Sequence, residues 1–319
     1  MRVVILIPCF NEAVAIGQVV ADFRAALPGA QILVCDNASS DGTAEAARAA
    51  GAQVLAEPRR GKGHAVRRLF AAAEADAYIL VDGDGTYDAA SAPAMLVMLA
   101  EQRLDMVTAT RVSAAQAAYR AGHRLGNRAI TGAIAALFGH GVPDMLSGYR
   151  VFSHRFVKSF PALARGFETE TEFTVHALEL GMPVASLASA YRARPEGSHS
   201  KLNTFRDGFR ILLTVLGLLQ REKPLPFFGA ISIGLAGLGL LLSLPVLQHF
   251  SETGLVPRLP TAVLSMGLVL AGLLSLACGL VLETVTRGRQ EAKRMAYLSL
   301  PGPGSAAADD KTRRESHNP

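Results

Sequence analysis

The stretch AYILVDGD, residues 77–84, is an apolar run that ends in two carboxylates separated by one glycine. Similar short apolar runs stand at residues 3–7, 31–35, 53–56 and 105–109. Ala-rich stretches typical of helices lie between them, at 13–27, 43–50, 63–75 and 91–103. Strands that alternate with helices predict a parallel sheet with helices on both faces. We therefore expect an α/β fold for the first part of the chain.

Polar side chains follow four of these expected strands. In open α/β sheets, ligands bind outside the carboxyl ends of the strands, so four polar loops at such ends indicate one shared site. The residues are Pro8, Asn11 and Glu12 after the first strand, Asp36, Asn37 and Asp41 after the second, Arg60 and Lys62 after the third, and Asp82 and Asp84 after the fourth.

Asp82 and Asp84 are candidate metal ligands. Alternate residues of an extended segment point the same way, so both carboxylates would face one ion. Hard oxygen ligands suit Mg²⁺ or Mn²⁺, which keep waters and bridge to substrate phosphates. Taken alone, two such carboxylates are equally typical of a solvated turn.

Two common nucleotide-binding motifs are missing where they would be expected. The segment Pro8-Cys9-Phe10-Asn11 after the first strand is not the glycine-rich dinucleotide fingerprint. Gly61-Lys62-Gly63 has neither the spacing nor the hydroxyl of a phosphate-binding loop.

The composition indicates a globular part joined to a membrane part. Hydrophobic residues make up 50% of the 319 residues and charged residues only 18%, whereas about a quarter is usual for charged residues. The net charge of +5 is small and dispersed, which argues against a nucleic-acid partner. The three cysteines form no CxxC pair, so a disulfide framework or a zinc site is not expected.

The apolar excess is concentrated near the C-terminus. Residues 224–251 and 259–282 contain no charged side chain, and each stretch exceeds the roughly 20 residues that cross a bilayer. We expect transmembrane helices at about 226–248 and 260–282; two buried helices of a soluble core are the alternative. Basic residues flank the pair and are scarce in the connection, which predicts that both ends are cytoplasmic.

Four regions follow from this pattern. Residues 1–202 form a cytoplasmic catalytic domain, and residues 203–223 an amphipathic helix at the membrane interface or, alternatively, packed on that domain. Residues 224–283 form the two-helix hairpin, and residues 284–319 a basic segment with a disordered tail.

Taken together, three segments resemble the family 2 glycosyltransferases of GT-A fold. They are Ile7 to Glu12, Asp36 to Thr43 and Val81 to Asp84. Two further segments followed by two spans, Ser147-Gly148-Tyr149-Arg150 and Gly197 to Leu202, resemble the polyprenyl-phosphate glycosyltransferases. The resemblance covers about residues 1–220. It departs after Asp84, where Gly85-Thr86 stands in place of the Leu-Gln of many relatives.

The resemblance implies roles for individual residues. Asp82 and Asp84 would hold the donor diphosphate through Mg²⁺ or Mn²⁺ and, with Arg111 and Arg124, form the catalytic set. Glu170 would be a sugar-binding group or, alternatively, an exposed carboxylate at a helix start. The donor-binding residues would be Pro8, Asn11, Glu12, Asp36, Asn37, Asp41, Lys62 and Asp82, and the acceptor phosphate would be bound by Arg111, Arg124, Arg128, Arg194, Ser200 and Lys201, with Arg192 an alternative to Arg194.

The activity that the resemblance implies is inverting transfer of a sugar from a UDP- or GDP-linked donor to a polyprenyl phosphate in the membrane. Two alternatives stay open: transfer to a lipid hydroxyl, which would require a general base, and a scaffold without activity. A homo-oligomer also stays open. The sequence does not identify the sugar.

Overall fold

The structure is a computed structural model that describes residues 1–112, 132, 144–164, 166, 168–192, 216–217 and 219–303. The chain forms two compact units. One contains Met1–Phe209 together with Lys293–Pro319, and the other contains Arg210–Ala292.

The first unit is built on a seven-stranded sheet of order β3-β2-β1-β4-β6-β5-β7. Strand β6 is antiparallel to both of its neighbours, and the other pairings are parallel. The strands are β1 (Val3–Cys9), β2 (Gln31–Asp36), β3 (Gln53–Ala56), β4 (Ala77–Leu80), β5 (Met106–Val112), β6 (Arg150–Ser153) and β7 (Val184–Ala190).

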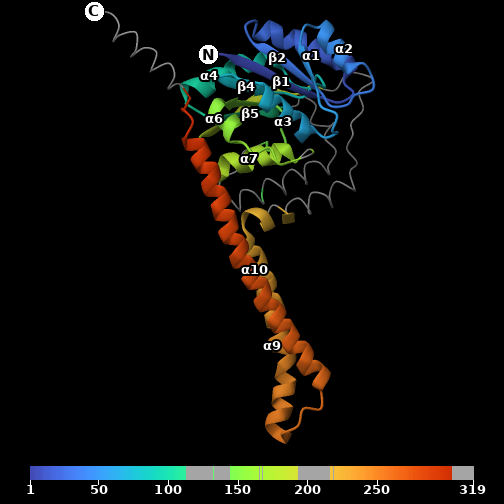
Figure 1. Cartoon of the computed structure of the whole chain (residues 1–319), viewed down its shortest axis with the longest axis vertical. Coiled ribbons are helices and arrows are strands. Elements are labelled where there is room, and N and C mark those ends of the chain that lie inside the picture. Colours follow the sequence, from blue (N-terminus) through green and yellow to red (C-terminus); the bar gives the residue numbers. More distant parts are fainter. Residues whose placement is uncertain are drawn as a thin grey trace, which may run out of the picture. The chain divides into compact units, whose positions relative to one another are not determined.

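Helices cover both faces of this sheet (Figure 1). The expected strands and helices up to β5 are confirmed, and β6 and β7 extend the sheet beyond them. The helices are α1 (Ala13–Ala26), α2 (Thr43–Ala49), α3 (Lys62–Ala72), α4 (Ala92–Glu101) with the short 3₁₀ turn η1 (Ala89–Ser91) before it, α6 (His154–Ser159) and α7 (Thr169–Glu179).

Each face of the sheet packs on a hydrophobic core, because successive strand residues point to opposite faces and are apolar on both. On one face, Ile5 and Ile79 join a buried cluster with Ile16 of α1 and Leu99 of α4. On the other face the core is aromatic: the Phe152 ring of β6 lies 5.9 Å from Phe70 of α3, 4.4 Å from Phe156 of α6 and 4.9 Å from Phe173 of α7. The fold is therefore a three-layer α/β/α sandwich with a mostly parallel sheet.

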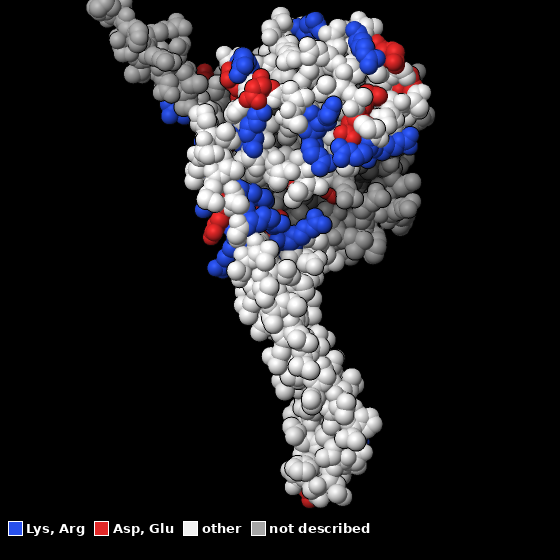
Figure 2. All heavy atoms as spheres, viewed as in Figure 1, with Lys and Arg blue, Asp and Glu red and all other residues white. Residues whose placement is uncertain are grey.

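The second unit contains α9 (Pro224–Thr253) and α10 (Leu259–Leu298) as far as Ala292. Each of these helices is long and apolar enough to cross a membrane. Only 17% of the most apolar window of each helix is buried, whereas core helices of a soluble protein would be mostly buried. Figure 2 shows the surface of this hairpin as almost entirely uncharged. Both helices are longer than the predicted spans, and α10 continues through the first part of the basic segment expected from residue 284.

Small residues at intervals of seven bring α9 and α10 close together. The buried positions are Ser232, Gly239 and Val246 on α9, and Ser265, Gly272, Gly279 and Thr286 on α10. A Cβ atom on Gly239 would lie 2.8 Å from the Ser265 carbonyl oxygen, so only glycine fits there. The Ser275 hydroxyl also donates a hydrogen bond of 3.0 Å to the Phe228 carbonyl across the pair.

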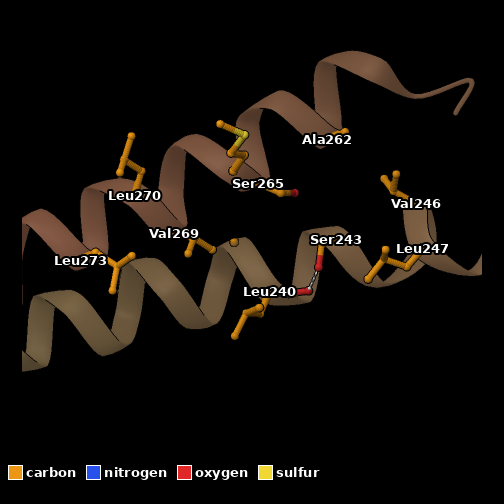
Figure 3. A pocket seen from close by; sticks show the side chains of 11 residues that line it. Leu240, Ser243, Val246, Leu247, Ala262, Ser265, Val269, Leu270 and Leu273 are labelled. Carbon is orange, nitrogen blue, oxygen red and sulfur yellow. Dashed lines mark hydrogen bonds between the residues drawn. The ribbon is translucent and has the colours of Figure 1, made fainter.

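An apolar groove of about 490 Å³ lies between α9 and α10 (Figure 3). Leu240 and Leu247 from α9 and Leu270 from α10 are among its walls. The Ser243 and Ser265 hydroxyls that line it each donate to a carbonyl of their own helix, at 2.7 and 2.8 Å. The groove therefore offers an apolar surface such as lipid chains cover.

A matched pair of glycines tests the packing of the hairpin. Gly239→Ala should lower its stability in detergent by about 1–3 kcal/mol, because overpacking a tight contact forces the helices apart. Gly237→Ala is the control, since nothing lies within 4 Å of a Cβ atom there. Thermal unfolding of the purified protein measures both, and equal effects would contradict the packing described above.

A second pair tests the loop between α6 and α7. A Cβ atom on Gly63 would lie 2.1 Å from the Ala164 carbonyl oxygen, so Gly63→Ala should cost about 1–3 kcal/mol. Gly17 lies inside α1 with nothing within 4 Å, so Gly17→Ala should stabilise by about 0.4–1 kcal/mol. Chemical denaturation followed by circular dichroism measures both changes. A stabilising Gly63→Ala would show that this loop is not held against α3.

Candidate active site

The sheet brings the predicted loops to one edge. Because every strand except β6 runs the same way, the carboxyl ends of β1 to β5 meet there, together with the start of β6 at Arg150. The described residues that the sequence assigned to the site and that lie in these loops or at these strand ends are Pro8, Asn11, Glu12, Asp36, Asn37, Asp41, Lys62, Asp82, Asp84 and Arg111.

The loops after β1 and β2 are tied to each other by side-chain hydrogen bonds. Asn11 adopts a left-handed backbone conformation with φ of 54°, and its Oδ1 accepts a bond of 2.9 Å from the Ser40 amide. The Asn11 amide in turn donates to the Ser39 hydroxyl at 3.0 Å, and the Ser39 amide donates to the half-buried Asp36 carboxylate at 3.3 Å. These loops therefore form one wall, with Asp36 at its centre.

Asp41 is used to build this wall. Its carboxylate accepts the Ala13 amide at 3.0 Å and the Thr43 amide at 3.1 Å, so it joins the first turns of α1 and α2. Burial alone would raise the pKa of Asp41, but the hydrogen bond from the Thr43 hydroxyl and those from backbone amides lower it overall. The Glu12 amide donates to Thr43 Oγ1 at 2.9 Å in the same junction.

Asn37, expected to contact the donor, forms hydrogen bonds with the neighbouring loop. It is 3% exposed, and its amide nitrogen donates to the Glu57 carbonyl at 3.1 Å and to the Arg59 carbonyl at 2.6 Å. Its oxygen accepts the Gly61 amide at 2.7 Å. With its amide group used in this way, Asn37 shapes the turn that leads into Lys62.

Lys62 is the centre of the site. Its buried ammonium group donates to Asp82 Oδ1 at 2.5 Å and forms an ion pair with Glu170, which begins α7. Burial by itself would lower the pKa of Lys62, but the two carboxylates outweigh it and hold the pKa above its ordinary value. Three segments far apart in the sequence therefore meet at one cation.

Glu170 is 4% exposed, and its two carboxylate oxygens differ in their contacts. Its Oε1 contacts Lys62, whereas Oε2 is buried and accepts no hydrogen bond from the residues that the structure describes. The alternative of an exposed carboxylate at a helix start is therefore wrong for Glu170. A buried acceptor without a partner costs free energy.

Strand β4 ends at Leu80, so Asp82 and Asp84 follow the strand and do not lie within it, and Asp84 lies in a turn. Asp84 is 5% exposed and accepts the Thr86 amide at 3.1 Å and the Thr86 hydroxyl at 2.7 Å. The carboxylate oxygens of Asp82 and Asp84 fit Mg²⁺ or Mn²⁺, which bind one or two carboxylates and complete their coordination shell with water and phosphate. Within the described residues, no cluster of three acidic, histidine or cysteine side chains could hold a metal by itself.

The Ser147-Gly148-Tyr149-Arg150 segment packs directly on Asp82. A Cβ atom on Gly148 would lie 2.3 Å from Asp82 Oδ2, and the Gly148 amide donates to the Tyr87 hydroxyl at 2.9 Å. Arg150, completely buried, donates to the Met145 carbonyl at 2.6 Å and to the Ser147 carbonyl at 3.1 Å. Burial lowers the pKa of Arg150 to about 10, so it stays a cation at neutral pH.

Arg111, the predicted acceptor arginine, forms a bidentate ion pair with Asp144 at 2.7 and 2.8 Å. The sequence reasoning missed Asp144, whose only signal is its position three residues before Ser147. Exposed Arg192 pairs with Asp88 at 3.1 Å. The other expected acceptor residues, Arg124, Arg128, Arg194, Ser200 and Lys201, lie outside the described residues.

Comparison with known proteins identifies relatives. The family model described as glycosyl transferase family 2 matches residues 4–160. Glycosyltransferase AglJ of Haloferax volcanii is 34% identical over 93% of this chain and 98% of its own length. The dolichyl-phosphate hexose transferase of the same organism is 26% identical over 67% of this chain and 92% of its own.

Solved structures share the fold. Glucosyl-3-phosphoglycerate synthase of M. tuberculosis superposes with a TM-score of 0.56 at 22% identity, over 69% of this chain and 80% of that one. The same enzyme has been crystallised with Mn²⁺, UDP and phosphoglyceric acid. Together with the full-length match to AglJ, the edge of polar loops on a mostly parallel sheet shows that this chain belongs to glycosyl transferase family 2, with a GT-A fold.

Proposed function

We propose that the protein is an inverting hexosyltransferase that moves a sugar from a UDP- or GDP-linked donor to a polyprenyl phosphate in the membrane. The observation that carries this proposal is the presence, in one chain, of a family 2 domain and a hairpin of two exposed apolar helices. The printed name of the dolichyl-phosphate hexose transferase, a relative over two thirds of the chain, supports the same acceptor class.

The donor would lie along the carboxyl edge. The wall around Asp36 would face its nucleoside, and Arg60, whose guanidinium lies 5.2 Å from the centre of the Phe10 ring, would stand beside it. Asp82 and Asp84 would hold Mg²⁺ or Mn²⁺, which would neutralise charge on the departing diphosphate. Glu170 would accept a hydroxyl of the sugar through its buried Oε2.

The acceptor phosphate is already anionic near neutral pH, so it can attack the anomeric carbon without a general base. The protein would position it through Arg111, whose fork is oriented by Asp144, together with Arg124. Direct attack inverts the configuration and needs no covalent intermediate. This favours a lipid phosphate over a lipid hydroxyl, and the retained Asp82 and Asp84 argue against an inactive scaffold.

We further propose that the hairpin crosses the bacterial-type inner membrane, with the catalytic domain in the cytoplasm. Basic residues flank the two uncharged stretches, at Arg221 and Lys223 before the first and at Arg287 and Arg289 after the second, whereas Arg258 is the one basic residue between them. This asymmetry supports a topology with both ends on the cytoplasmic side, where a nucleotide-sugar donor would be available.

The activity and its metal dependence can be tested together. Purified protein in nanodiscs containing undecaprenyl phosphate should transfer a radiolabelled sugar from at least one of a panel of UDP- and GDP-hexoses. EDTA should abolish the transfer. Asp84→Asn should reduce it at least about 100-fold, because the metal clamp supplies several kcal/mol of transition-state stabilisation.

Asp22→Asn is the control and should keep full activity. Among the described residues, the Asp22 carboxylate on α1 accepts a hydrogen bond from Gln18 of the same helix. Full turnover in EDTA would contradict the metal assignment. Transfer to a lipid alcohol as efficient as transfer to the phosphate would contradict the acceptor assignment.

Glu170 gives a separate test of the sugar subsite. Glu170→Gln keeps the shape but removes the charge, so a hydrogen bond of about 1.5–3 kcal/mol to a sugar hydroxyl is weakened. The Kd of the nucleotide-sugar should rise by roughly 10- to 150-fold, while the Kd of the free nucleoside diphosphate changes little. Exposed Glu168 starts the same helix, and Glu168→Gln should change neither. Equal losses for both ligands in calorimetry would remove Glu170 from the sugar subsite.

A further inference from the structure

Two tyrosines connect polar groups that the proposed function assigns to the two substrates. Tyr87 stands three residues after Asp84, and Tyr191 follows the last residue of β7. The two residues pair as an isolated antiparallel bridge, and their ring centres lie 5.3 Å apart with the ring planes inclined at 72°. This edge-to-face arrangement is one that aromatic rings prefer. Both tyrosines belong to the unit that contains the sheet.

Backbone hydrogen bonds hold the end of β7 between β5 and the turn of Asp84. The Tyr191 amide donates to the Val112 carbonyl at 3.1 Å. The next amide along the chain, that of Arg192, donates to the Thr86 carbonyl at 2.8 Å. Thr86 in turn donates its own amide and its hydroxyl to the Asp84 carboxylate. The position of Tyr191 is therefore tied to the position of that carboxylate.

Tyr87 extends the connection to the other candidate metal ligand. Its hydroxyl accepts the Gly148 amide at 2.9 Å, and Gly148 packs on the Asp82 carboxylate. Tyr87 is 8% exposed, and its ring also packs edge-to-face on that of Tyr149, with 5.5 Å between the ring centres. Tyr191 thus rests on a buried ring that contacts the backbone beside Asp82.

The Tyr191 ring also contacts Arg111. The central carbon of the Arg111 guanidinium lies over this ring, 5.5 Å from its centre, which is within the roughly 6 Å range of a cation–π contact. Asp144 accepts hydrogen bonds from Nε and Nη2 of the same guanidinium. Two contacts of different kinds therefore restrict the orientation of Arg111.

From these contacts we infer that Tyr191 is a positioning residue for Arg111, and that its ring sets the place of this arginine relative to Asp82 and Asp84. Direct displacement requires the attacking phosphate and the departing diphosphate to be held at a fixed separation, and a misplacement of about 1 Å is costly. Tyr191 contacts the candidate acceptor arginine and is anchored on the segments that carry the two carboxylates. The inference rests on the proposed function, which assigns Arg111 to the acceptor and the carboxylates to the metal.

The test uses the full chain in nanodiscs that contain undecaprenyl phosphate. Tyr191→Leu removes the ring, Tyr191→Phe keeps it, and Arg111→Ala removes the group that it positions. Leu187→Ala is the matched control, because Leu187 lies on β7 and packs on the core cluster that Tyr191 also contacts. The measurements are kcat and KM for the lipid phosphate, thermal unfolding, and Mn²⁺ binding with UDP and with GDP, followed by electron paramagnetic resonance.

Tyr191→Leu should lower kcat/KM for the lipid phosphate at least about tenfold. In the Arg111→Ala background the same substitution should change it by less than about twofold, because two residues that act through one contact are not additive. Tyr191→Phe should recover kcat/KM to within about threefold of the wild type. Mn²⁺ binding should stay within about twofold in Tyr191→Leu, since Thr86 and Gly148 keep their contacts with the carboxylates. Leu187→Ala should lower the unfolding temperature and leave kcat/KM unchanged.

Three results would overturn the inference: an equal loss from Tyr191→Leu with and without Arg111, a Tyr191→Phe variant as impaired as Tyr191→Leu, or a loss of Mn²⁺ binding in Tyr191→Leu. A wild type inactive on the lipid phosphate would instead reject the proposed function. The nuclear magnetic resonance signal of the Arg111 Nε proton would then decide the placement, because a ring beneath a guanidinium shields its protons. The signal should move downfield in Tyr191→Leu and stay in place in Tyr191→Phe; an unchanged signal in both variants overturns the inference.

Discussion

The active site depends on one buried ammonium group, that of Lys62. It accompanies Asp82 at the end of β4 and Glu170 at the start of α7, and neither an amine nor a carboxylate is stable in such a place without its counter-charge. The three segments must therefore assemble together. Two glycines permit the approach: Gly63 lets the loop before α7 lie on α3, and Gly148 leaves room for the Asp82 carboxylate. The site is thus a product of tertiary packing as much as of its loops.

Several polar residues of the motifs have structural contacts in the walls of the site. Asn37 uses its side-chain amide on the loop before Lys62, and Asp41 joins two helix starts. Arg150 is a buried cation that holds the backbone on which Gly148 stands. By contrast, Glu170 keeps an unpaired buried oxygen. The difference matters for interpreting substitutions, because loss of a wall residue affects every ligand at the site, whereas loss of a contact residue affects only one.

The sequence predicted what is local and missed what is not. Apolar runs and Ala-rich helices located β1 to β5 and α1 to α4, since periodicity is a property of neighbouring residues. The sequence could not show that β6 runs antiparallel to β4 and β5, because pairing between distant segments sets the direction of a strand. Asp144 was missed for the same reason: its importance lies in a contact with Arg111, from which it is separated by 33 positions in the sequence. Lys293 and Tyr297 belong to the basic segment expected from residue 284, and the sequence does not set them apart from its other residues. Their contacts with Glu179 and Asp105 do.

Strand β5 has a buried or half-buried ion pair at each of its ends. Asp105 precedes its first residue and pairs with Arg155, whereas Arg111, the candidate acceptor arginine, stands near its last residue and pairs with Asp144. The two ion pairs are therefore separated by the length of the strand, which rises about 3.3 Å per residue. A substitution at Asp105 would leave the polar groups at the carboxyl edge in place, because they stand at the other end of β5.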